Sequence, residues 1–278
     1  MNNLLARFRR RSRQVKLTWG RLRRDLAWFV SGRSLSGPIL ADTISQRKWL
    51  FLVGCNNSGT TILHDLLVST EQFSALPHEG QRYTRQLAIA ERRGFERVWT
   101  EYLTDLQMTE ADGTDIVSRL VYDWLFEASP KNRALFIEKT TANAVRMRWL
   151  QKAFPNSYFI GVIRNGFAVA EGIRRKGKKD IARAARHWNR VNELMLRDSR
   201  LIRHFLQLRY EDVVAAPQDT VSKVAEFLGY SPGFHASPVA CEHLVDMNED
   251  SLIQLTMPDR EAILTEAGPL LREFGYAD

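Results

Sequence analysis

The sequence predicts an α/β fold: a parallel sheet of about five strands flanked by helices, with a helical cap and a basic N-terminal helix. Five short apolar or β-rich runs support this prediction, and most are continuous rather than alternating, as expected of strands buried on both faces. They lie at residues 49–53, 73–76, 135–137, 158–163 and 205–209. Helical patterns separate the runs, and this alternation is typical of a parallel sheet.

The segments between the runs show the spacing of apolar residues that helices require. We expect helices at residues 61–69, 142–154, 180–204 and 218–228. A longer, mostly helical stretch at residues 82–128 is broken at Asp112-Gly113. Ligands of such sheets bind beyond the carboxyl ends of the strands, so we expect residues 82–130 to form a cap over that edge.

The composition excludes several classes of protein. With 278 residues, 44% of them hydrophobic and 26% charged, the chain is neither disordered nor fibrous. Its apolar runs are too short for a membrane-spanning helix. Only Cys55 and Cys241 are present, and the N-terminus lacks the apolar core of a secretory signal, so we expect a reducing cytoplasm and no disulfide framework.

The positive charge is concentrated at the N-terminus. The formal net charge is +8, but residues 1–24 hold nine Arg or Lys and no acid, which leaves −1 for residues 25–278. The high isoelectric point is therefore no argument for nucleic-acid binding by the main domain. A stretch rich in Ser and Gly at residues 31–37 predicts a linker, so we divide the chain into a basic segment with its linker at 1–37 and a main domain at 38–278.

Apolar residues of the basic segment share one helical face. They are Leu5, Phe8, Val15, Trp19, Leu22, Leu26 and Phe29. A basic amphipathic helix at residues 1–30 suits an anionic membrane surface and would make the protein peripheral on a membrane. Two alternatives are a helix packed on its own domain with solvated arginines and a cleaved organelle transit segment.

The stretch GCNNSGTT at residues 54–61, here called the glycine loop, lies between the first strand and a helix. Glycines let the backbone approach an oxyanion, and a helix N-terminus presents free N–H groups. Thr60 stands where a nucleoside-triphosphate loop has its lysine, which weighs against ordinary ATP or GTP hydrolysis. The structural alternative is a tight glycine turn with a threonine cap.

Two further signals follow in order. The fourth run ends at Arg164, before the turn Asn165-Gly166 and a helix, so this arginine points at the ligand crevice. The fifth run leads into Arg209-Tyr210-Glu211-Asp212 and a helix that begins at Pro217. In this order, the glycine loop and these segments resemble the sulfotransferase family that uses 3′-phosphoadenosine 5′-phosphosulfate (PAPS), over residues 48–230.

The resemblance implies roles for the loop and the strand end. Ser58, Gly59, Thr60 and Thr61 would bind the 5′-phosphosulfate, and Arg164 would bind the 3′-phosphate. The sequence departs from the family at two cofactor-binding positions: Asn57 replaces a basic loop residue, and Gly172 replaces the serine eight positions after the strand-end arginine. The first change removes a cation and the second removes a hydroxyl, and we expect both changes to affect rate and donor affinity.

The resemblance also implies catalytic residues. Lys139 in EKTT matches the lysine of the family's E-K-T-P motif and could balance charge on the bridging oxygen; alternatively it is solvated. Glu79 in LPHEGQRYT would be the base, with His78 as the other candidate, unless Glu79 only pairs with Arg82.

Other charged and aromatic groups have weaker assignments. The basic cluster at 174–179 could reach the 3′-phosphate or an acidic acceptor, or be a solvated face. His64 is interpreted as packing or solvent-facing, and Trp188, next to His187, as core. No His/Cys cluster has metal-ligand spacing, so no metal is expected.

The predicted reaction is sulfuryl transfer from PAPS to a hydroxyl of an acceptor, a carbohydrate, lipid or small molecule, shaped by the cap and residues 231–278. Adenosine 3′,5′-bisphosphate is the other product. The alternatives are a metal-dependent kinase or nucleotidase of the same architecture and a non-catalytic nucleotide or anion binder. A nucleic-acid module, supported only by the N-terminal segment, is not expected.

Overall fold

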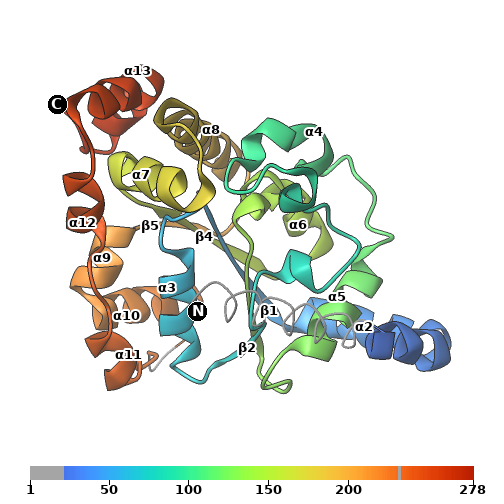
Figure 1. Cartoon of the computed structure of the whole chain (residues 1–278). Coiled ribbons are helices and arrows are strands. Elements are labelled where there is room, and N and C mark those ends of the chain that lie inside the picture. Colours follow the sequence, from blue (N-terminus) through green and yellow to red (C-terminus); the bar gives the residue numbers. More distant parts are fainter. Residues whose placement is uncertain (1–21, 231–232) are drawn as a thin grey trace, which may run out of the picture.

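The computed structural model describes residues 22–230 and 233–278. Five strands form one parallel sheet in the order β2-β3-β1-β4-β5 (Figure 1). They are β1 (Lys48–Gly54), β2 (Phe73–Ala75), β3 (Leu135–Lys139), β4 (Ser157–Ile163) and β5 (Phe205–Arg209). The predicted α/β class with a parallel sheet and all five predicted strands are confirmed, whereas most of the predicted basic N-terminal helix lies outside the described residues.

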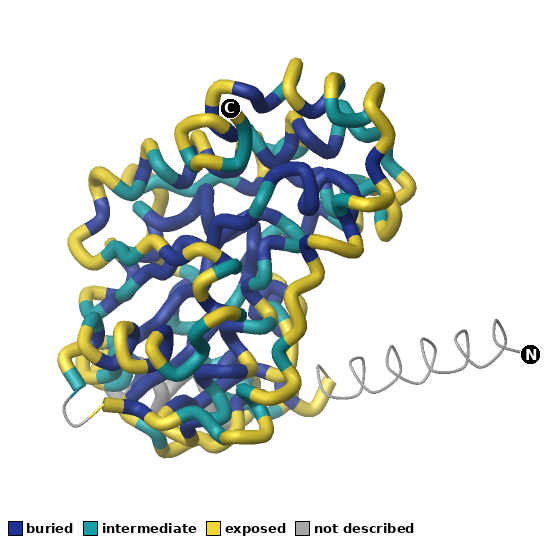
Figure 2. The backbone as a smooth tube through the Cα atoms, turned by 90° about the vertical axis from the view of Figure 1, so that its left-hand side faces the viewer, coloured by how far each residue is buried: buried dark blue, intermediate teal, exposed yellow. Residues whose placement is uncertain are grey.

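The central strand β1 shows why these runs become strands. It pairs with β3 on one side and β4 on the other, and its side chains alternate between two buried apolar clusters. Trp49, Phe51 and Val53 belong to one cluster, and Leu50 and Leu52 belong to the other. Both faces of the sheet are therefore covered, which is why the run is continuously apolar (Figure 2).

The helices after the sheet strands pack on these two faces. They are α3 (Thr60–Val68), α5 (Val117–Glu127), α6 (Met147–Ala153), α7 (Gly166–Gly177), α8 (Ile181–Ser199), α9 (Tyr210–Ala215), α10 (Pro217–Phe227), α11 (Pro238–Glu242), α12 (Asn248–Ile253) and α13 (Met257–Glu273). Leucines of α3 lie in the second cluster, whereas apolar residues of α5, α6, α7 and α8 lie in the first. The strand order reverses at β1, so the loop that follows β1 lies at the switch point where parallel sheets bind ligands.

The predicted linker at residues 31–37 is wrong. The backbone there is helical: a π-helix, η1 (Trp28–Gly32), runs into α2 (Arg33–Gln46). Local Ser and Gly content predicts a linker, but Leu40 of α2 is buried in the first cluster and α2 packs against α5, and these tertiary contacts stabilise the helix.

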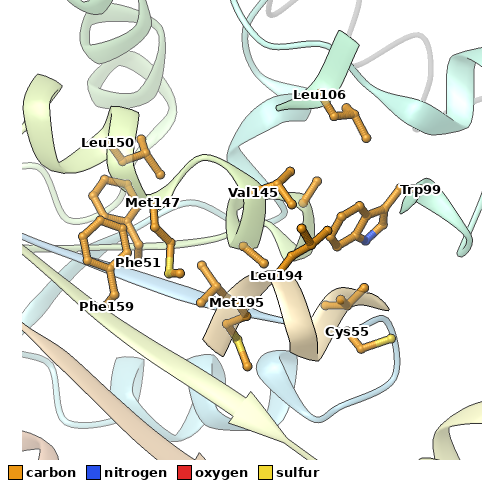
Figure 3. Packing of buried hydrophobic residues seen from close by; sticks show 14 of the residues in the cluster. Phe51, Cys55, Trp99, Leu106, Val145, Met147, Leu150, Phe159, Leu194 and Met195 are labelled. Carbon is orange, nitrogen blue, oxygen red and sulfur yellow. The ribbon is translucent and has the colours of Figure 1, made fainter. Parts of the chain in front are cut away.

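The cap at residues 82–130 is less helical than predicted. Besides α5 it contains only short turns among its described residues: the 3₁₀-helices η2 (Gly80–Arg82), η3 (Ala90–Arg93) and η4 (Trp99–Tyr102), and the four-residue α4 (Leu103–Leu106). Single apolar side chains anchor it instead, because Trp99 and Leu106 enter the core beside Val145 and Leu194 (Figure 3).

The buried side chain of Arg146 holds the cap in place through hydrogen bonds to its backbone. The predicted helix at 142–154 is split into η5 (Thr141–Val145) and α6, and Arg146 lies at the break. Its guanidinium donates to the carbonyl oxygens of Leu106 (2.8 Å) and Ala88 (2.9 Å). These bonds satisfy cap backbone groups that no helix or strand pairs, so an irregular segment keeps a fixed position over the strand ends.

Candidate active site

The glycine loop closes tightly between β1 and α3. Gly54 and Gly59 have φ of 153° and 93°, in the region that side chains disfavour. A Cβ at Gly54 would lie 2.6 Å from the carbonyl oxygen of Val162, and one at Gly59 would lie 2.4 Å from Cδ2 of Tyr210. Both glycines are therefore required by close approach, and the loop delivers the free N–H groups of the first turn of α3 to the strand edge.

Tyr210 supports both the loop and the strand-end arginine. Its ring lies under Gly59, and the guanidinium carbon of Arg164 is 4.1 Å from the ring centroid. Arg164 donates from Nε to Oδ1 of Asn248 (2.8 Å) and from Nη1 to the carbonyl oxygen of Asn57 (3.0 Å). Its Nη2 is buried with no hydrogen-bond partner among the described residues, so one donor of Arg164 is available to a ligand.

A cavity of about 390 Å³ opens at this edge of the sheet. Its lining includes six of the seven predicted cofactor-binding residues, namely Asn57, Gly59, Thr60, Thr61, Arg164 and Gly172. Ser58 is fully buried and does not line it, although its Oγ has no partner within the described structure. The cap contributes Glu91, Glu96 and Arg97, and the C-terminal part contributes Met247 and Ser251. The cavity is therefore shared by the loop, the cap and the C-terminal region.

The two positions that depart from the family pattern are neighbours. A Cβ at Gly172 would lie 3.4 Å from Cγ and 3.5 Å from Nδ2 of Asn57. The Oδ1 of Asn57 accepts from Nη1 of Arg97 (3.0 Å) and from Nζ of Lys176 (3.4 Å). The uncharged side chain of Asn57 thus accepts hydrogen bonds from two cationic side chains.

The residues of the basic cluster at 174–179 do not all face the cavity. Arg175 and Lys176 line the cavity, and Arg175 pairs with Glu171 (3.0 Å). Arg174 instead pairs with Asp259 (2.9 Å) at the start of α13. Lys178 and Lys179 do not line the cavity, so the interpretation of these two as a surface face is retained.

Lys139 lies at the end of β3 beside the glycine loop. Its Nζ donates to Oγ1 of Thr61 (2.8 Å), and burial lowers the pKa of Lys139. The predicted lysine therefore reaches the loop rather than pointing into bulk solvent.

Glu79 lines the cavity, whereas His78 is exposed and does not. The Oε2 of Glu79 accepts from Gln81 (3.1 Å) and pairs with Arg82 (3.4 Å). The geometry thus contains both the cavity-facing carboxylate and the Arg82 pair that the sequence left as alternatives. It favours Glu79 over His78 as the group that can reach an acceptor.

The backbone next to Glu79 is clamped by buried side chains. Glu138 accepts from the N–H of Gly80 (2.7 Å), and the indole of Trp124 donates to the carbonyl oxygen of Gly80 (3.0 Å). Thr140 and Asn143 also donate to Glu138, at 2.5 and 2.6 Å. Burial outweighs these donors and raises the pKa of Glu138 to about 7. A Cβ at Gly80 would lie 2.7 Å from Oε1 of Glu138, so a larger residue at position 80 would clash with this carboxylate.

His187 connects the cap to the loop. Its Nδ1 accepts from the N–H of Thr100 (3.4 Å) and lies 2.7 Å from Oγ1 of that residue, so the proton belongs on Nε2, which faces Oδ1 of Asn56 (3.3 Å). Burial lowers the pKa of His187 to about 3, so the ring is neutral. Trp188 is a core residue, as expected, and donates to the carbonyl oxygen of Arg164 (3.0 Å).

The remaining candidates are structural. His64 is buried, which fits the interpretation as packing, and lies 2.8 Å from Asp65. Both cysteines are free, and burial raises the pKa of the Cys55 thiol. Across residues 22–230 and 233–278, no group of three or more His, Cys, Asp or Glu is placed to hold a metal ion. Within the same ranges no helix is long and apolar enough to cross a membrane.

Some site residues were not found from the sequence. Arg97 belongs to a polar stretch with several arginines, and no sequence signal distinguishes it from them. In the structure its backbone has a left-handed φ of 63°. Asn248 belongs to no motif, and Glu138 lies in the EKTT motif, which does not indicate its contact with Gly80. Tyr210 could have been found, because it follows a strand end directly and the sequence already singled out that segment.

Comparison with known proteins decides the family. A family model described as the sulfotransferase family matches residues 50–234. The chain belongs to the sulfotransferase family. Curated relatives include the omega-hydroxy-beta-dihydromenaquinone-9 sulfotransferase Stf3 of Mycobacterium bovis and that of Mycobacterium tuberculosis. Each is 20% identical, with 86% of this chain and 78% of the relative covered.

Solved sulfotransferases share the fold. STF1 from Mycobacterium tuberculosis has a TM-score of 0.54 at 14% identity, covering 88% of this chain and 81% of its own. STF9 from Mycobacterium avium also has a TM-score of 0.54, at 16% identity, covering 92% of this chain and 86% of its own. The predicted sulfotransferase resemblance and the P-loop-type α/β fold are confirmed.

Proposed function

We propose that this sulfotransferase uses PAPS as its donor and transfers the sulfuryl group to a hydroxyl of an acceptor. The observation that supports this best is the cavity itself, in which a lysine-free glycine loop faces the side chains of Arg164, Arg97, Arg175 and Lys176. Buried donors without partners among the described residues, Nη2 of Arg164 and Nδ2 of Asn57, fit a ligand rich in phosphate oxygens. The acceptor class stays open among carbohydrate, lipid and small molecule.

The chain supplies the groups that such a transfer needs. Glu79 takes the proton of the acceptor hydroxyl as its oxygen bonds to sulfur. The bond from sulfur to the 5′-phosphate oxygen breaks, and Lys139 with the N–H groups of the loop stabilises the charge on that oxygen. Arg164 holds the 3′-phosphate, and Thr60 and Thr61 donate to the 5′-phosphosulfate. No metal takes part in this scheme.

The test is transfer of a label from PAPS that is radiolabelled in the sulfuryl group, without added metal. The acceptor panel contains sugars, phenols and lipid alcohols, the last because the name of the relative Stf3 specifies the omega-hydroxyl of a dihydromenaquinone. Labelled acceptor supports the proposal. Phosphate transfer from ATP with magnesium would favour a kinase, and tight PAPS binding without any transfer would favour a non-catalytic binder.

A further inference from the structure

Asn57 leaves the glycine loop without the basic side chain found there in the family. Two cationic side chains from other segments nevertheless lie beside residue 57. Arg97 of the cap and Lys176 of α7 both donate to Oδ1 of Asn57, at 3.0 and 3.4 Å. Their charges therefore lie beside the tip of residue 57, although they come from segments far away in sequence.

This arrangement is held in place by several contacts. The backbone of Arg97 has a left-handed φ of 63°, which costs a non-glycine residue conformational energy and marks a constrained position. Its side chain passes Gly177, where a Cβ would lie 3.2 Å from Cδ of Arg97. Trp99, two residues later, is buried in the core and anchors the segment. Gly172 leaves room for Asn57, and Gly177 leaves room for Arg97.

Arg97 and Lys176 donate to an uncharged amide, and among the described residues neither forms an ion pair with a carboxylate. Burial and the charges of Arg97, Arg175 and Arg164 lower the pKa of Lys176, with Glu171 as the opposing acid. Glu171 is paired to Arg175 at 3.0 Å. Nε of Arg97 is buried and has no hydrogen-bond partner among the described residues. Like charges held this close destabilise one another until an anion lies between them.

We propose that Arg97 and Lys176 supply, from the cap and from α7, the positive charge that the loop lacks, and that Asn57 acts as the positioning residue that orients them on the phosphate groups of the donor. This inference rests on the proposed function, since it assumes a donor with two anionic ends. It also gives the cap a role in donor binding, so donor affinity depends on the cap position that Trp99 and Arg146 fix.

The experiment is calorimetric titration of adenosine 3′,5′-bisphosphate into four variants. Arg97→Ala is expected to weaken binding roughly 10- to 100-fold, as loss of a charge-assisted bond predicts. Asn57→Arg in the same chain restores the charge to the loop, so the double variant should regain most of the affinity. Asn57→Arg alone keeps Arg97 and adds a third cation, so it should bind the anionic bisphosphate at least as tightly as the double variant. Arg92→Ala, an exposed arginine of the same segment, is the matched control.

The outcomes separate the two proposals. If the unmodified protein fails to bind the bisphosphate, the proposed function fails. If it binds but Arg97→Ala binds equally well, or if Asn57→Arg gives no rescue, the supply of charge from the cap is wrong and the proposed function stands. A loss in Arg92→Ala equal to that in Arg97→Ala would mean a general charge effect and would also overturn the inference.

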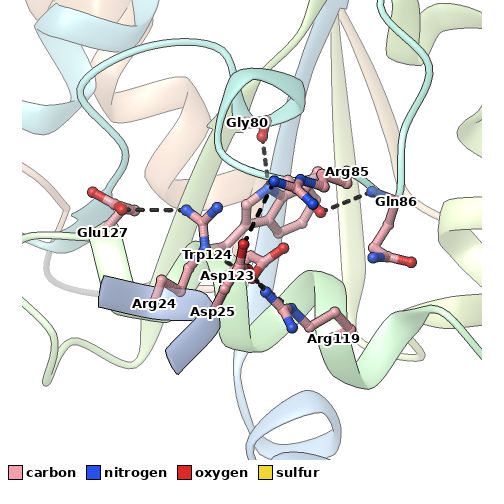
Figure 4. A network of polar contacts seen from close by, with 10 residues as sticks. Arg24, Asp25, Gly80, Arg85, Gln86, Arg119, Asp123, Trp124 and Glu127 are labelled. Carbon is pink, nitrogen blue, oxygen red and sulfur yellow. Dashed lines mark hydrogen bonds and ion pairs between the residues drawn. The ribbon is translucent and has the colours of Figure 1, made fainter. Parts of the chain in front are cut away.

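A second, independent observation concerns residues 22–30. Here Arg24 is buried and Asp25 is partly buried, whereas Leu22, Leu26, Phe29 and Val30 are exposed. Arg24 is 1% exposed and pairs with Asp123 (2.9 Å) and Glu127 (3.2 Å), whereas Leu26 and Phe29 are 66% and 78% exposed. Figure 4 shows Arg24 and Asp25 directed at acidic and basic partners on and near α5. A helix packed on its own domain through an apolar face would show the reverse.

The ion pairs of Arg24 with Asp123 and Glu127 and of Asp25 with Arg119, here called the polar clamp, fix which face of the helix points outward. Asp25 pairs with Arg119, and Trp28 packs on Tyr122 with ring centroids 4.8 Å apart. Leu22, Leu26, Phe29 and Val30, here called the outer apolar face, are all at least 60% exposed. The spacing of these four residues places them on one side of a helix. Exposed apolar side chains grouped in this way mark an interaction surface.

The charge of the adjoining sequence indicates the partner. Residues 1–24 contain nine Arg or Lys and no acid. Apolar side chains next to such a basic segment match an anionic bilayer, which takes up apolar groups at its interface and attracts cations at its surface. We infer that the outer apolar face docks on an anionic membrane surface, with the polar clamp to α5 holding the domain against it.

Vesicle co-sedimentation of the full chain tests this inference. The protein is expected to bind vesicles that contain phosphatidylserine and to leave pure phosphatidylcholine vesicles in the supernatant. The double variant Leu26→Gln, Phe29→Gln should bind about tenfold more weakly, because two apolar side chains no longer enter the bilayer interface. Leu201→Gln, at another exposed leucine, should behave like the unmodified chain. Equal binding by the double variant, or no binding by the unmodified chain, would overturn the inference. So would a dimer in sedimentation analysis that this variant abolishes, because the face would then cover a second copy.

Discussion

The side chain of Asn57 occupies the space beside Gly172, so that a Cβ added at position 172 would lie 3.4 Å from Cγ of Asn57. Relative to the family pattern, a loop cation and a serine hydroxyl are both missing, and the two positions meet in the structure. We therefore interpret the two changes as one local rearrangement of the proposed donor site.

This contact predicts the effect of a larger residue at 172. Gly172→Leu is expected to push Asn57 away from Arg97 and Lys176 and to weaken binding of adenosine 3′,5′-bisphosphate about tenfold or more. Asn57→Ala in the same chain makes room for the leucine, so it should relieve the overpacking measured by thermal unfolding but not restore the affinity. Undiminished affinity in Gly172→Leu would show that the contact has no bearing on the donor.

Glu79 is predicted to act on the acceptor and not on the donor. Glu79→Gln should lower kcat by about 10²- to 10⁴-fold, as loss of a general base does, while the dissociation constant of the bisphosphate changes little. Glu96→Gln, another acid of the cavity lining, is the control and should retain turnover. If both variants turn over at the rate of the unmodified enzyme, the base is a different group.

Lys139 is predicted to act on the leaving oxygen. Its hydrogen bond to Thr61 places it at the loop, so Lys139→Met should lower kcat by about 10²- to 10³-fold through loss of charge stabilisation. Binding of PAPS, measured under conditions without acceptor, should fall much less. A variant that loses binding and turnover in equal proportion would make Lys139 a binding residue only.

Glu138 makes stability depend on pH. Its pKa is about 7 in the fold and has an ordinary value of 4.5, so the folded state holds this proton more strongly. The contribution of Glu138 to the free energy of unfolding is therefore complete below pH 4.5 and decreases as pH rises toward 7. Glu138→Gln should destabilise the protein by about 1–3 kcal/mol and cost more at pH 5 than at pH 8. Urea unfolding at both values measures this; an equal cost at the two values would contradict it.

Periodicity predicted the sheet and most helices, because strands buried on both faces and helices packed on a sheet leave strong local patterns. The residues 49–53 show this clearly, since both of their faces lie in apolar clusters. The cap was harder, because it is positioned by distant contacts: Trp99 reaching the core and Arg146 bonding to the carbonyl oxygen of Leu106. Such contacts leave no periodic signal.

The candidate site likewise contains residues that the sequence predicts and residues that only distant contacts place there. The loop, Arg164, Lys139 and Glu79 lie at the ends of strands or directly after them, so motif order alone brought them together. Arg97 comes from an irregular segment, and its meeting with Asn57 depends on how that segment folds over the loop. Residues of the loop could therefore be predicted from the sequence, but the partners that replace its missing charge could not.

The central claim is that the cavity holds a 3′-phosphorylated adenine nucleotide, and calorimetric titration of adenosine 3′,5′-bisphosphate tests it most directly. The titration is made without metal, with 5′-AMP and ATP as controls. The account predicts tight, metal-independent binding that requires the 3′-phosphate and is lost in Arg164→Ala. Absence of binding, or preference for ATP with magnesium, would contradict it and leave a sulfotransferase fold with a different donor chemistry.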